Sequence, residues 1–541
     1  TIVVLITFLT LFILYPLAIL LVDSFVSDNG LTFDIFKRIF NMPTFTKAIT
    51  NTLKVGFLVG ILSALIGLLF AYVEVYVRMN KFVGGLFKVV SMLPVVSPPF
   101  VLSLSMIMLF GKAGIITRFL LGIYDNSVYG YWGIVIVQTL TFFPVAFMTL
   151  STILARIDPN LEDAAYSLGA SSFKVFRSVT LPLAAPGIAN AFLLVFSCSL
   201  ADFATPQVLG GHSFPVLPTQ AYLQITGMYD FKGGSALSFM LLIPAIAVYV
   251  LQRYWVGKKS YVTVSGKAGG RSSVKGPGLM LTSGIVGVVA FVSVFIMYLY
   301  AIIRSASMVK IWGINNTLTL EHYEYVFTYG MKAIKDTLLI ACIGTPLGGL
   351  LAVLVGYATT RLKVRGSRTL ETVSLLNYTL PGTVVGIAYI IAFNDKPIVL
   401  TGTLYILVAA YVFRYSSAGI RNVIAALTQI DPSIEEASRS LGASSVKTFT
   451  SVTVPLVLPA ILAGMRYLFI HSMTAISATI FLVSVHWTLI TTRILECMTE
   501  LQFAQACAFS IVLIGLVFIA SGVMNLIARA LCRNGDAIGV H

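Results

Sequence analysis

The sequence predicts an all-α integral membrane protein built from two tandem halves, each with six membrane-spanning helices. Three observations support this prediction. Hydrophobic residues make up 57% of the 541-residue chain, charged residues only 11%, and the mean hydropathy is +0.92. About 12 segments are apolar over the roughly 20 residues that a helix needs to cross a bilayer. Finally, residues 157–188 and 430–461 are near copies of each other.

The expected spans form two sets of six, one before residue 260 and one after residue 276. They centre, in chain order, on Leu11, Ala64, Leu102, Thr141, Ser197, Ala245, Val289, Ala352, Val384, Val412, Ile476 and Leu513. Their apolar runs are continuous, as in residues 2–22, whereas the strands of a membrane β-barrel alternate. We therefore expect a first half at 1–258, a Gly- and Ser-rich basic linker at 259–277, and a second half at 278–541.

The strongest evidence for two halves is the duplicated polar segment. Residues 157–188 and 430–461 match at 20 of 32 positions without a gap, at an offset of 273. The second spans are less similar and align at an offset of 285, so the first half should hold extra residues in its outward loop at 111–131. A repeat indicates a repeated structural unit, so we expect whatever these segments do to happen twice.

Basic residues place the duplicated segments in the cytoplasm. Loops rich in Lys and Arg face that side, and residues 253–275, between the sixth and seventh spans, hold six basic residues and no acidic one. Counting spans from this loop puts both duplicated segments and both termini in the cytoplasm, in a bacterial inner membrane. No basic patch interleaved with aromatic residues indicates nucleic acid. Because Thr1 lies inside an apolar run, we expect the initiating Met and any N-terminal extension to be missing.

Each duplicated segment predicts a short helix, a turn and a second helix. An Asp-Pro pair begins each copy, at 158–159 and 431–432, which is typical of a capped helix start. Gly169 and Gly442 suit the left-handed position that ends such a helix, and the Ser-Ser pair after each can cap the next helix. We expect four later prolines to end that second helix before the next span: Pro182, Pro186, Pro455 and Pro459.

The pattern Glu-x-Ala-x-x-x-Leu-Gly-Ala, followed by Phe, Val-Thr and Pro-x-x-x-Pro, occurs in both copies and resembles the EAA motif of binding-protein-dependent ABC importer permeases. The resemblance implies two halves of the type I importer fold, in which this motif forms coupling helices that dock onto two ATP-binding cassette subunits. The positions implied for ATPase coupling are Glu162, Ala164, Ala165, Gly169, Glu435, Glu436, Ala437 and Gly442. A solute-binding protein outside the cytoplasm is the third implied partner, besides the lipid bilayer.

A narrower resemblance concerns the cargo. The fused layout and residues 199–230 are similar to the ferric-iron permeases of this family, which implies import of ferric iron by alternating access. Permeases for phosphonate, phosphorylated solutes or thiamine are alternatives, because they share the layout and specificity depends largely on the separate binding protein.

No catalytic apparatus is expected in this chain. A G-x-x-x-x-G-K-[ST] phosphate loop does not occur, since Gly266-Lys267 is followed by Ala268 and lacks the upstream glycine. The sequence also has no Ser-His-Asp pattern, zinc helix or Gly-rich cofactor fingerprint. We therefore expect no enzyme activity, cofactor or metal in the permease itself, with ATP and Mg²⁺ on the partner subunits.

Five ionisable residues in or near the expected spans are candidates for the translocation pathway, because a charge in hydrocarbon is costly unless it is paired or hydrated. They are Asp202, Arg414, Arg466, His471 and Glu74. Asp202 falls toward the outer end of the fifth span, where it either lines a vestibule or is a hydrated residue at a helix end. A metal site of Asp202 with His212 and Tyr222 has no diagnostic spacing.

The basic and acidic candidates also have structural interpretations. Arg414 can contact an anionic substrate, pair with an acid or bind backbone carbonyls. Glu74 and Arg78, one helical turn apart, either pair with each other or simply anchor the helix end at the membrane surface. The five cysteines contain no CxxC pair and are expected to be packing residues, and the spacing of Gly348, Ala352 and Gly356 favours close helix packing.

Two other classes of protein are alternatives to an importer permease. A 12-helix secondary transporter driven by an ion gradient also has internal repeats, but it would need coupling acids near the midplane and no pair of docking segments. A membrane-embedded enzyme would need a catalytic cluster that the sequence does not contain.

Overall fold

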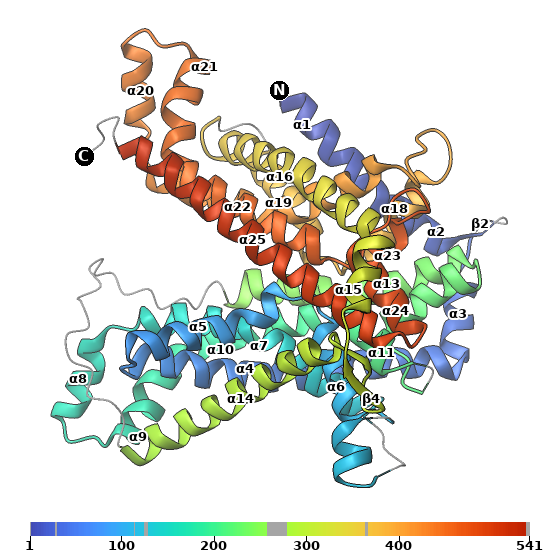
Figure 1. Cartoon of the computed structure of the whole chain (residues 1–541). Helices are drawn as coiled ribbons and strands as arrows, with labels where there is room; N and C mark the ends of the chain where they lie inside the picture. Colours follow the sequence, from blue (N-terminus) through green and yellow to red (C-terminus); the bar gives the residue numbers. More distant parts are fainter. Residues whose placement is uncertain are drawn as a thin grey trace. The chain divides into compact units, whose positions relative to one another are not determined.

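The computed structural model describes residues 2–27, 30–112, 114–123, 128–211, 213–256, 279–362 and 366–536. Within these residues the ordered elements are helices and two short antiparallel hairpins (Figure 1). The predicted all-α membrane fold is confirmed. The predicted linker at 259–277 and the side chain of His212 lie outside the described residues.

Contacts divide the chain into two compact units, each named after the half of the sequence that supplies most of it. The N-terminal unit comprises residues 40–220 and 240–320. The C-terminal unit comprises residues 1–39, 221–239 and 321–541. The helices α3 (Asp34–Asn41), α12 (Leu217–Tyr222) and α13 (Phe231–Leu251) pass from one unit to the other.

The other elements each belong to one unit. The N-terminal unit holds α4 (Pro43–Tyr76), α5 (Lys81–Val96), α6 (Val101–Phe110), η2 (Ile115–Leu120), α7 (Tyr131–Ala155), α8 (Pro159–Ser167), α9 (Ser172–Val175), η3 (Phe176–Thr180), α10 (Leu181–Ala201), α11 (Ala204–Leu209), η5 (Gln252–Val256), α14 (Leu279–Ala306), β3 (Val309–Ile311) and β4 (Asn315–Leu318), where η marks a π-helical turn. The C-terminal unit holds α1 (Ile2–Leu9), η1 (Thr10–Leu14), α2 (Tyr15–Phe25), β1 (Val26–Ser27), β2 (Gly30–Leu31), η4 (Leu223–Gly227), α15 (Glu321–Thr328), α16 (Met331–Thr360), α17 (Ser367–Thr379), α18 (Gly382–Phe393), α19 (Leu404–Gln429), α20 (Ser433–Ser440), α21 (Ser445–Thr448), η7 (Phe449–Thr453), α22 (Val454–Thr474), α23 (Thr479–Leu482), α24 (Ile490–Thr499) and α25 (Phe503–Asp536).

Three long helices form the centre of each unit. In the N-terminal unit α4, α7 and α10 pack on one another, and α16, α19 and α22 do the same in the C-terminal unit. Glycine makes this packing possible: a Cβ added to Gly348 would lie 2.1 Å from Leu468, and one added to Gly464 would lie 2.4 Å from the Cα of Gly419. The prediction of close packing at the small residues of the eighth span is therefore confirmed.

The first helix of each sequence half belongs to the unit formed by the other half. Helix α2 packs on α18 in the C-terminal unit, whereas α14 packs on α4, α5 and α6 in the N-terminal unit. Tyr389 of α18 also binds η1, the turn directly before α2: its hydroxyl donates a hydrogen bond to the backbone oxygen of Phe12 (2.6 Å). The packed units therefore differ from the continuous halves of the sequence by an exchange of first helices.

Ten helices of the described residues are long and apolar enough to cross a membrane. The bent pair α17 and α18, which meet at 107°, provides an eleventh segment if it is one broken span. The predicted span around Val412 is α19, which is helical but less apolar because Arg414, Arg421 and several polar residues interrupt it. The longer outward connection predicted for the first half is present, at 111–130 against 394–403 in the second.

One predicted helix end is wrong. The second helix of each duplicated segment does not stop at the prolines but continues into the span, as one helix at Ser172–Ala201 and another at Ser445–Thr474. A π-helical turn precedes each first proline, so that the N–H of Leu181 bonds to the oxygen of Phe176. This wider turn makes room for a ring that would otherwise clash with the preceding turn. The spans consequently begin earlier than the predicted centres at residues 197 and 476 suggest.

Candidate functional site

Each duplicated segment folds as a helix, a turn and a helix, which we call an elbow. In the first elbow, residues 157–180, the carboxylate of Asp158 accepts a hydrogen bond from the N–H of Asn160 (3.0 Å). Gly169 has a φ of +81°, the left-handed conformation that glycine adopts without strain. The hydroxyl oxygen of Ser171 then accepts a hydrogen bond from the N–H of Lys174 (3.4 Å) and caps the next helix. The predicted start, turn and cap are confirmed.

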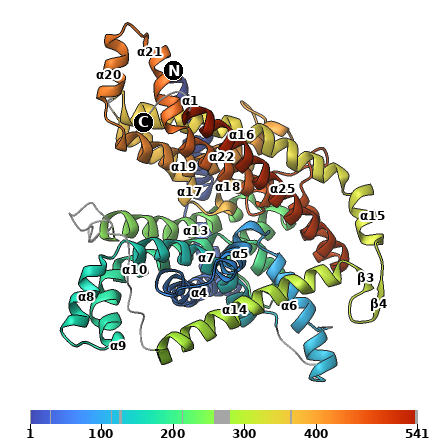
Figure 2. The same cartoon turned by 60° about the vertical axis from the view of Figure 1, so that its left-hand side comes forward.

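The second elbow, residues 430–453, repeats this geometry. Asp431 accepts a hydrogen bond from the N–H of Ser433 (2.9 Å), and this bond holds the pKa of the Asp431 carboxyl below its usual value. Gly442 has a φ of +85°, and Ser444 caps the second helix through the N–H of Lys447 (3.3 Å). Figures 1 and 2 show α8 with α9, and α20 with α21, projecting beyond the long helices of their own units.

A buried glutamate attaches the first elbow to its unit. Glu162 is only 4% exposed, and its carboxylate accepts hydrogen bonds from the hydroxyl of Tyr76 at the end of α4 (2.6 Å) and from Thr180 (2.8 Å). The ring of Tyr72 stacks on that of Tyr76 and meets Phe176 edge-on. The first elbow is thus bound to α4 by a neutral hydroxyl and by aromatic contacts.

The second elbow is attached by an ion pair at the equivalent place. Glu435, 5% exposed, accepts a hydrogen bond from Arg361 Nε (3.0 Å) at the end of α16 and another from Thr453 (3.1 Å). The same guanidinium also donates to the backbone oxygens of Leu427 (3.0 Å) and Ile430 (2.7 Å) at the end of α19. One arginine therefore joins the ends of α16 and α19 to the elbow.

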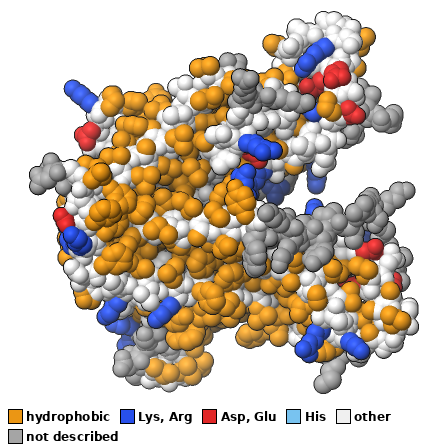
Figure 3. Space-filling view, turned by 180° about the vertical axis from the view of Figure 1, so that it is seen from behind, with side chains coloured by type: hydrophobic (Ala, Val, Ile, Leu, Met, Phe, Trp, Pro, Cys, Tyr) orange, Lys and Arg blue, Asp and Glu red, His pale blue; other side chains and the backbone are white. Residues whose placement is uncertain are grey.

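Apolar side chains are exposed at matching positions of the two elbows. Leu168 and Leu441 are each 89% exposed, directly before the turn glycines. Other exposed apolar positions are Leu161 and Phe173 in the first elbow and Ile434 and Val446 in the second. A hollow of about 480 Å³ lies in the second elbow, lined by Ile434, Ala437, Ser438, Leu441, Gly442, Ala443, Lys447 and Val452. Charged side chains gather on the projecting end of each unit, whereas hydrophobic side chains cover the long helices (Figure 3).

The predicted coupling residues divide into two groups. Exposed residues are Ala164, Gly169, Glu436, Ala437 and Gly442, with Ala165 half-buried. Glu162 and Glu435, by contrast, point into their own units, where they hold the elbows in place. Their partners were missed in the sequence, although Tyr76 and Arg361 occupy equivalent positions at the offset of 285 that aligns the second spans.

Asp202 lies at the junction of α10 and α11 and is 5% exposed. Its carboxylate accepts hydrogen bonds from the N–H groups of Ala204 (3.0 Å) and Thr205 (3.4 Å) and from the amide of Gln138 (2.9 Å). Ser199 in turn donates to the side-chain oxygen of Gln138 (2.5 Å). These bonds place Asp202 at a helix end, where it caps α11 and ties it to α7, but it is buried there and not hydrated as that interpretation expected.

Arg414 lies beside the break between α17 and α18. Its guanidinium donates hydrogen bonds to the backbone oxygens of Leu380 (3.0 Å) and Asn377 (3.4 Å), which the break leaves without helical partners. Of the three interpretations offered by the sequence, the contact with carbonyl oxygens is the one present. The side-chain nitrogen of Asn377 is buried without a hydrogen-bond partner in the described residues.

The remaining candidates from the spans occupy separate places. Glu74 accepts a hydrogen bond from Ser151 and forms an ion pair with Lys88 (3.6 Å), so the alternative of a pair with Arg78 is wrong. The residue one turn away is exposed beyond the helix end, whereas α5 brings a lysine alongside. Arg466 is exposed and donates to Asn525 of α25 (2.8 Å). His471 lies between the rings of two tyrosines of α19 and α22.

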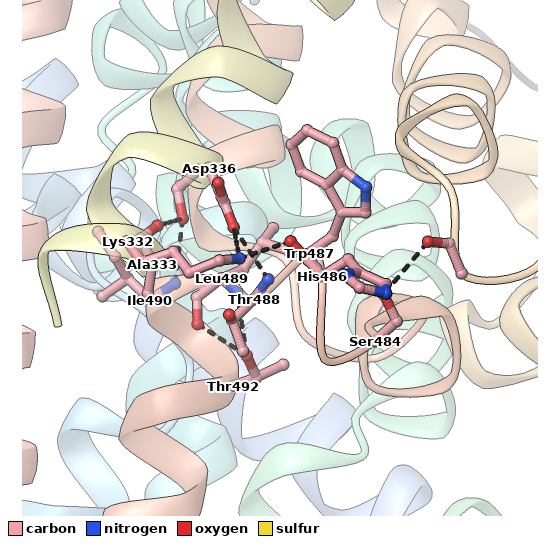
Figure 4. Close-up of polar contacts among 12 residues, drawn as sticks. Lys332, Ala333, Asp336, Ser484, His486, Trp487, Thr488, Leu489, Ile490 and Thr492 are labelled. Carbon is pink, nitrogen blue, oxygen red and sulfur yellow. Dashed lines mark hydrogen bonds and ion pairs between the residues drawn. The ribbon is translucent and has the colours of Figure 1, made fainter. Parts of the chain in front are cut away.

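On the opposite end from the elbows, the N-terminal part of α16 holds the loop that follows α23 (Figure 4). Asp336 accepts a hydrogen bond from the N–H of Thr488 (3.2 Å) and pairs with Lys332 (2.8 Å), whose ammonium also donates to the backbone oxygen of His486. One residue further, Thr337 accepts a hydrogen bond from the N–H of Ile490 (3.0 Å).

The N-terminal unit holds its corresponding loop with different chemistry. Asn51, equivalent to Asp336, donates its side-chain N–H to the backbone oxygen of Pro215 (2.9 Å). Pro215 stands where Thr488 stands in the other half and has no N–H to offer a carboxylate. Thr52 accepts a hydrogen bond from the N–H of Leu217 (2.8 Å), as Thr337 does in the other unit. Neither the bond from Asn51 to its loop nor the bond from the other loop to Asp336 was predicted from the sequence, although the bonded positions align between the halves.

Comparison with known proteins also finds a repeated region, one copy in each half of the chain. The family model described as "Binding-protein-dependent transport system inner membrane component" matches the chain twice, at residues 56–260 and 344–533. Both matches include an elbow. Neither includes α1 and α2 or α14, the first helices that the two units exchange.

Several curated relatives are similar along most of the chain. The putative ferric transport system permease protein FbpB 1 of Haemophilus influenzae is 39% identical over 488 residues, which are 87% of this chain and 76% of the relative. The ferric transport system permease protein FbpB of Actinobacillus pleuropneumoniae is 38% identical over 518 residues, 93% of this chain and 74% of the relative. The spermidine/putrescine permease PotC of H. influenzae is 26% identical over 256 residues, 46% of this chain but 92% of the relative.

Proposed function

Because the chain belongs to the family of binding-protein-dependent transport system inner membrane components, as a fused ABC importer permease of the ferric branch, we propose that it forms the membrane pathway for ferric iron in an ATP-driven importer. Two similar permeases that carry ferric transport in their names support the cargo. The family membership supports an ATP-driven importer over the secondary transporter and the membrane enzyme, the other classes considered from the sequence.

The observation that carries the mechanism is the pair of elbows. Two equivalent projections each expose apolar side chains, and a buried glutamate fixes each to the end of a long helix. Such a projection suits the groove of a partner protein. We propose that one ATP-binding subunit docks on each elbow. These two subunits would bind ATP with Mg²⁺, and the elbows would move as the subunits close on each other and open again. The permease would then alternate between outward and inward access.

The direction of transport follows from the predicted topology. Both elbows, both chain termini and the basic segment at 253–275 would lie in the cytoplasm. The loops held by Asn51 and Asp336 would face outward and receive the cargo from a solute-binding protein. Substrate choice would depend on that separate protein, so phosphonate, phosphorylated solutes and thiamine serve as competitors in the test of the cargo.

The docking proposal is tested by replacing the most exposed apolar residue of the second elbow, in the variant Leu441→Asp. The expected result is loss of copurification with the ATP-binding subunits and loss of uptake, because a charge would be buried in the interface. The matched control is Leu318→Asp, since Leu318 is 83% exposed in β4 and lies far along the chain from the elbow. The proposal fails if L441D retains both the ATP-binding subunits and uptake.

The cargo proposal is tested separately, with the reconstituted importer and its binding protein. Uptake of radioactive ferric iron should require ATP and should not fall when phosphonate or thiamine is added in excess. ATP-dependent uptake of one of these competitors, without uptake of iron, would overturn the cargo while leaving the docking result intact.

A further inference from the structure

Three tyrosines and a histidine from three helices form a cluster in the C-terminal unit, which we call the aromatic cluster. The ring of His471 lies 4.1 Å from that of Tyr467, one turn earlier on α22, and 5.4 Å from that of Tyr415 on α19, between ring centroids. Tyr378 of α17 lies 6.5 Å from Tyr467 on the same measure. The cluster thus joins α17, α19 and α22 next to the break at Leu380.

Three of the four side chains of this cluster, Tyr378, Tyr415 and His471, offer polar atoms to a ligand. Among the described residues, no hydrogen bond involves the ring nitrogens of His471 or the hydroxyls of Tyr378 and Tyr415. All four side chains are half-buried and are therefore not sealed inside the packed centre of the unit. Hydrogen-bonding groups without partners are costly in membrane-spanning helices, which makes such a group in a span a candidate for contact with cargo.

The other half of the chain shows that the fold does not require this cluster. At the offset of 273, the positions of Tyr415, Tyr467 and His471 are occupied by Phe142, Leu194 and Cys198. Yet α7 and α10 pack with α4 just as α19 and α22 pack with α16. The C-terminal half has therefore added phenols and an imidazole to a framework that is stable without them.

The position of the cluster along the membrane fits a role on the pathway. His471 follows the start of α22 by 17 residues, which is roughly 25 Å at 1.5 Å per residue, toward the outer side. Tyr378 directly precedes the 107° break between α17 and α18. Broken helices in the membrane occur where the backbone lines a cavity or binds a transported solute.

The charges nearby restrict the ligand. The guanidinium of Arg414 lies 5.7 Å from the ring of Tyr415, and that of Arg421 lies 5.0 Å from the ring of Tyr378. In the first half a threonine, Thr141, stands at the position of Arg414. Two positive groups oppose a bare trivalent cation, but they favour a metal ion that keeps anionic oxygen ligands.

We propose that the aromatic cluster is a contact site for the cargo, in which phenol oxygens and the imidazole nitrogen bind a ferric ion that retains a carboxylate or similar oxygen ligand. The inference rests on the proposed function and adds the residues that meet the cargo inside the membrane. Oxygen and nitrogen donors without thiolate or thioether suit a hard ferric ion. Each phenol that binds iron releases its proton to water, and the iron keeps its oxidation state.

The test uses the full chain assembled with its ATP-binding subunits in lipid nanodiscs, with ferric citrate as the probe. Ferric citrate should produce a visible phenolate-to-iron charge-transfer band. The variants Tyr415→Phe, Tyr378→Phe and His471→Gln should each weaken binding about tenfold or more, within the range of losses caused by changes around a metal site. The matched control Tyr405→Phe, at an exposed tyrosine that begins the same helix α19, should bind as the unchanged protein does.

Copurification with the ATP-binding subunits checks that each variant is folded. The inference is overturned if no charge-transfer band appears, if the three variants bind ferric citrate normally, or if citrate without iron binds equally well. Iron uptake by the unchanged importer is measured in parallel. Normal uptake with any of these outcomes rejects the cluster alone, whereas absence of iron uptake rejects the proposed cargo.

Discussion

Asn51 and Asp336 occupy equivalent positions but bind their loops through opposite groups. The amide of Asn51 donates to a carbonyl oxygen because the residue that it meets is Pro215, whereas Asp336 accepts from the N–H of Thr488. Lys332 adds an ion pair to Asp336. Each side chain is thus matched to the donor or acceptor that its own loop presents, and the two residues are not interchangeable.

This match predicts unequal effects of two reciprocal substitutions. Asn51→Asp places a carboxylate against the carbonyl oxygen of Pro215 and should destabilise the protein by about 1–3 kcal/mol. Asp336→Asn keeps an acceptor for the N–H of Thr488 and loses only the partly exposed ion pair, so its effect should be smaller. Thermal unfolding of the purified complex measures both. An equal shift of the two midpoints would contradict the assignment.

Asp202 is the residue for which the structure most changes the expectation. Because its carboxylate accepts three hydrogen bonds, Asp202→Asn should turn an N–H toward the donor group of Gln138 and lower stability, while uptake per folded complex stays normal. The double variant Gln138→Glu with Asp202→Asn restores one donor and one acceptor and should recover stability. Uptake that falls without a change in the unfolding midpoint would instead place Asp202 on the pathway.

At the scale of elements, the two elbows are attached to their units with different chemistry. Tyr76 binds the first elbow with one hydroxyl, and Arg361 binds the second with an ion pair and two carbonyl contacts. Both partners come from the C-terminal end of the first of the three central helices of their unit, α4 or α16. Force applied to an elbow therefore reaches α4 or α16 directly, through a buried carboxylate in either case.

The difference predicts a graded series of variants. Arg361→Gln leaves the buried carboxylate of Glu435 with only the more distant Arg439 (3.8 Å) as a cationic partner, and should cost roughly 3 kcal/mol of stability. Arg361→Tyr reproduces the chemistry of the first elbow and should cost less. The control is Tyr76→Phe, which removes one hydrogen bond and should cost about 1 kcal/mol. Thermal unfolding should rank the variants in this order, and a Tyr76→Phe effect as large as that of Arg361→Gln would refute the difference.

Local sequence signals identified the elements well but not the contacts between them. The Asp cap at 158, the left-handed turn at Gly169 and the serine cap at 171 are confirmed because their hydrogen bonds span two to three residues. The partners of Glu162 and Glu435 lie 86 and 74 residues away, beyond any local pattern. The helix end predicted at Pro182 is wrong because a π-helical turn before it makes room for the proline ring. The residues of that turn carry no local sequence signal that distinguishes it from an ordinary α-helical turn.

At the scale of the whole molecule, the exchange of first helices makes each half of the chain incomplete. The face of α18 is covered by α2 from the other half, and α4, α5 and α6 are covered in part by α14. Hydropathy identifies a span but carries no information on which half it packs against.

The exchange predicts how the halves behave when they are made as separate chains. Residues 1–258 and 279–541 expressed together should assemble, since each supplies the first helix of the other unit. Either fragment alone should be degraded, because the apolar face of its unit is uncovered. Membrane content of the tagged fragments measures this. Stable accumulation of one fragment without the other would show that the exchanged helix is dispensable.

The exchange also decides where the chain connects the two units. The backbone passes between them after residues 39, 220, 239 and 320, which the predicted topology places in outward loops or in the outward part of a span. The described elements on either side of residues 257–278, η5 and α14, belong to the same unit. In the predicted topology, the four crossings between described elements are therefore all toward the outer side. A partner that binds an elbow would then act at the end of the unit farthest from these crossings, where the described backbone does not restrain the elbow.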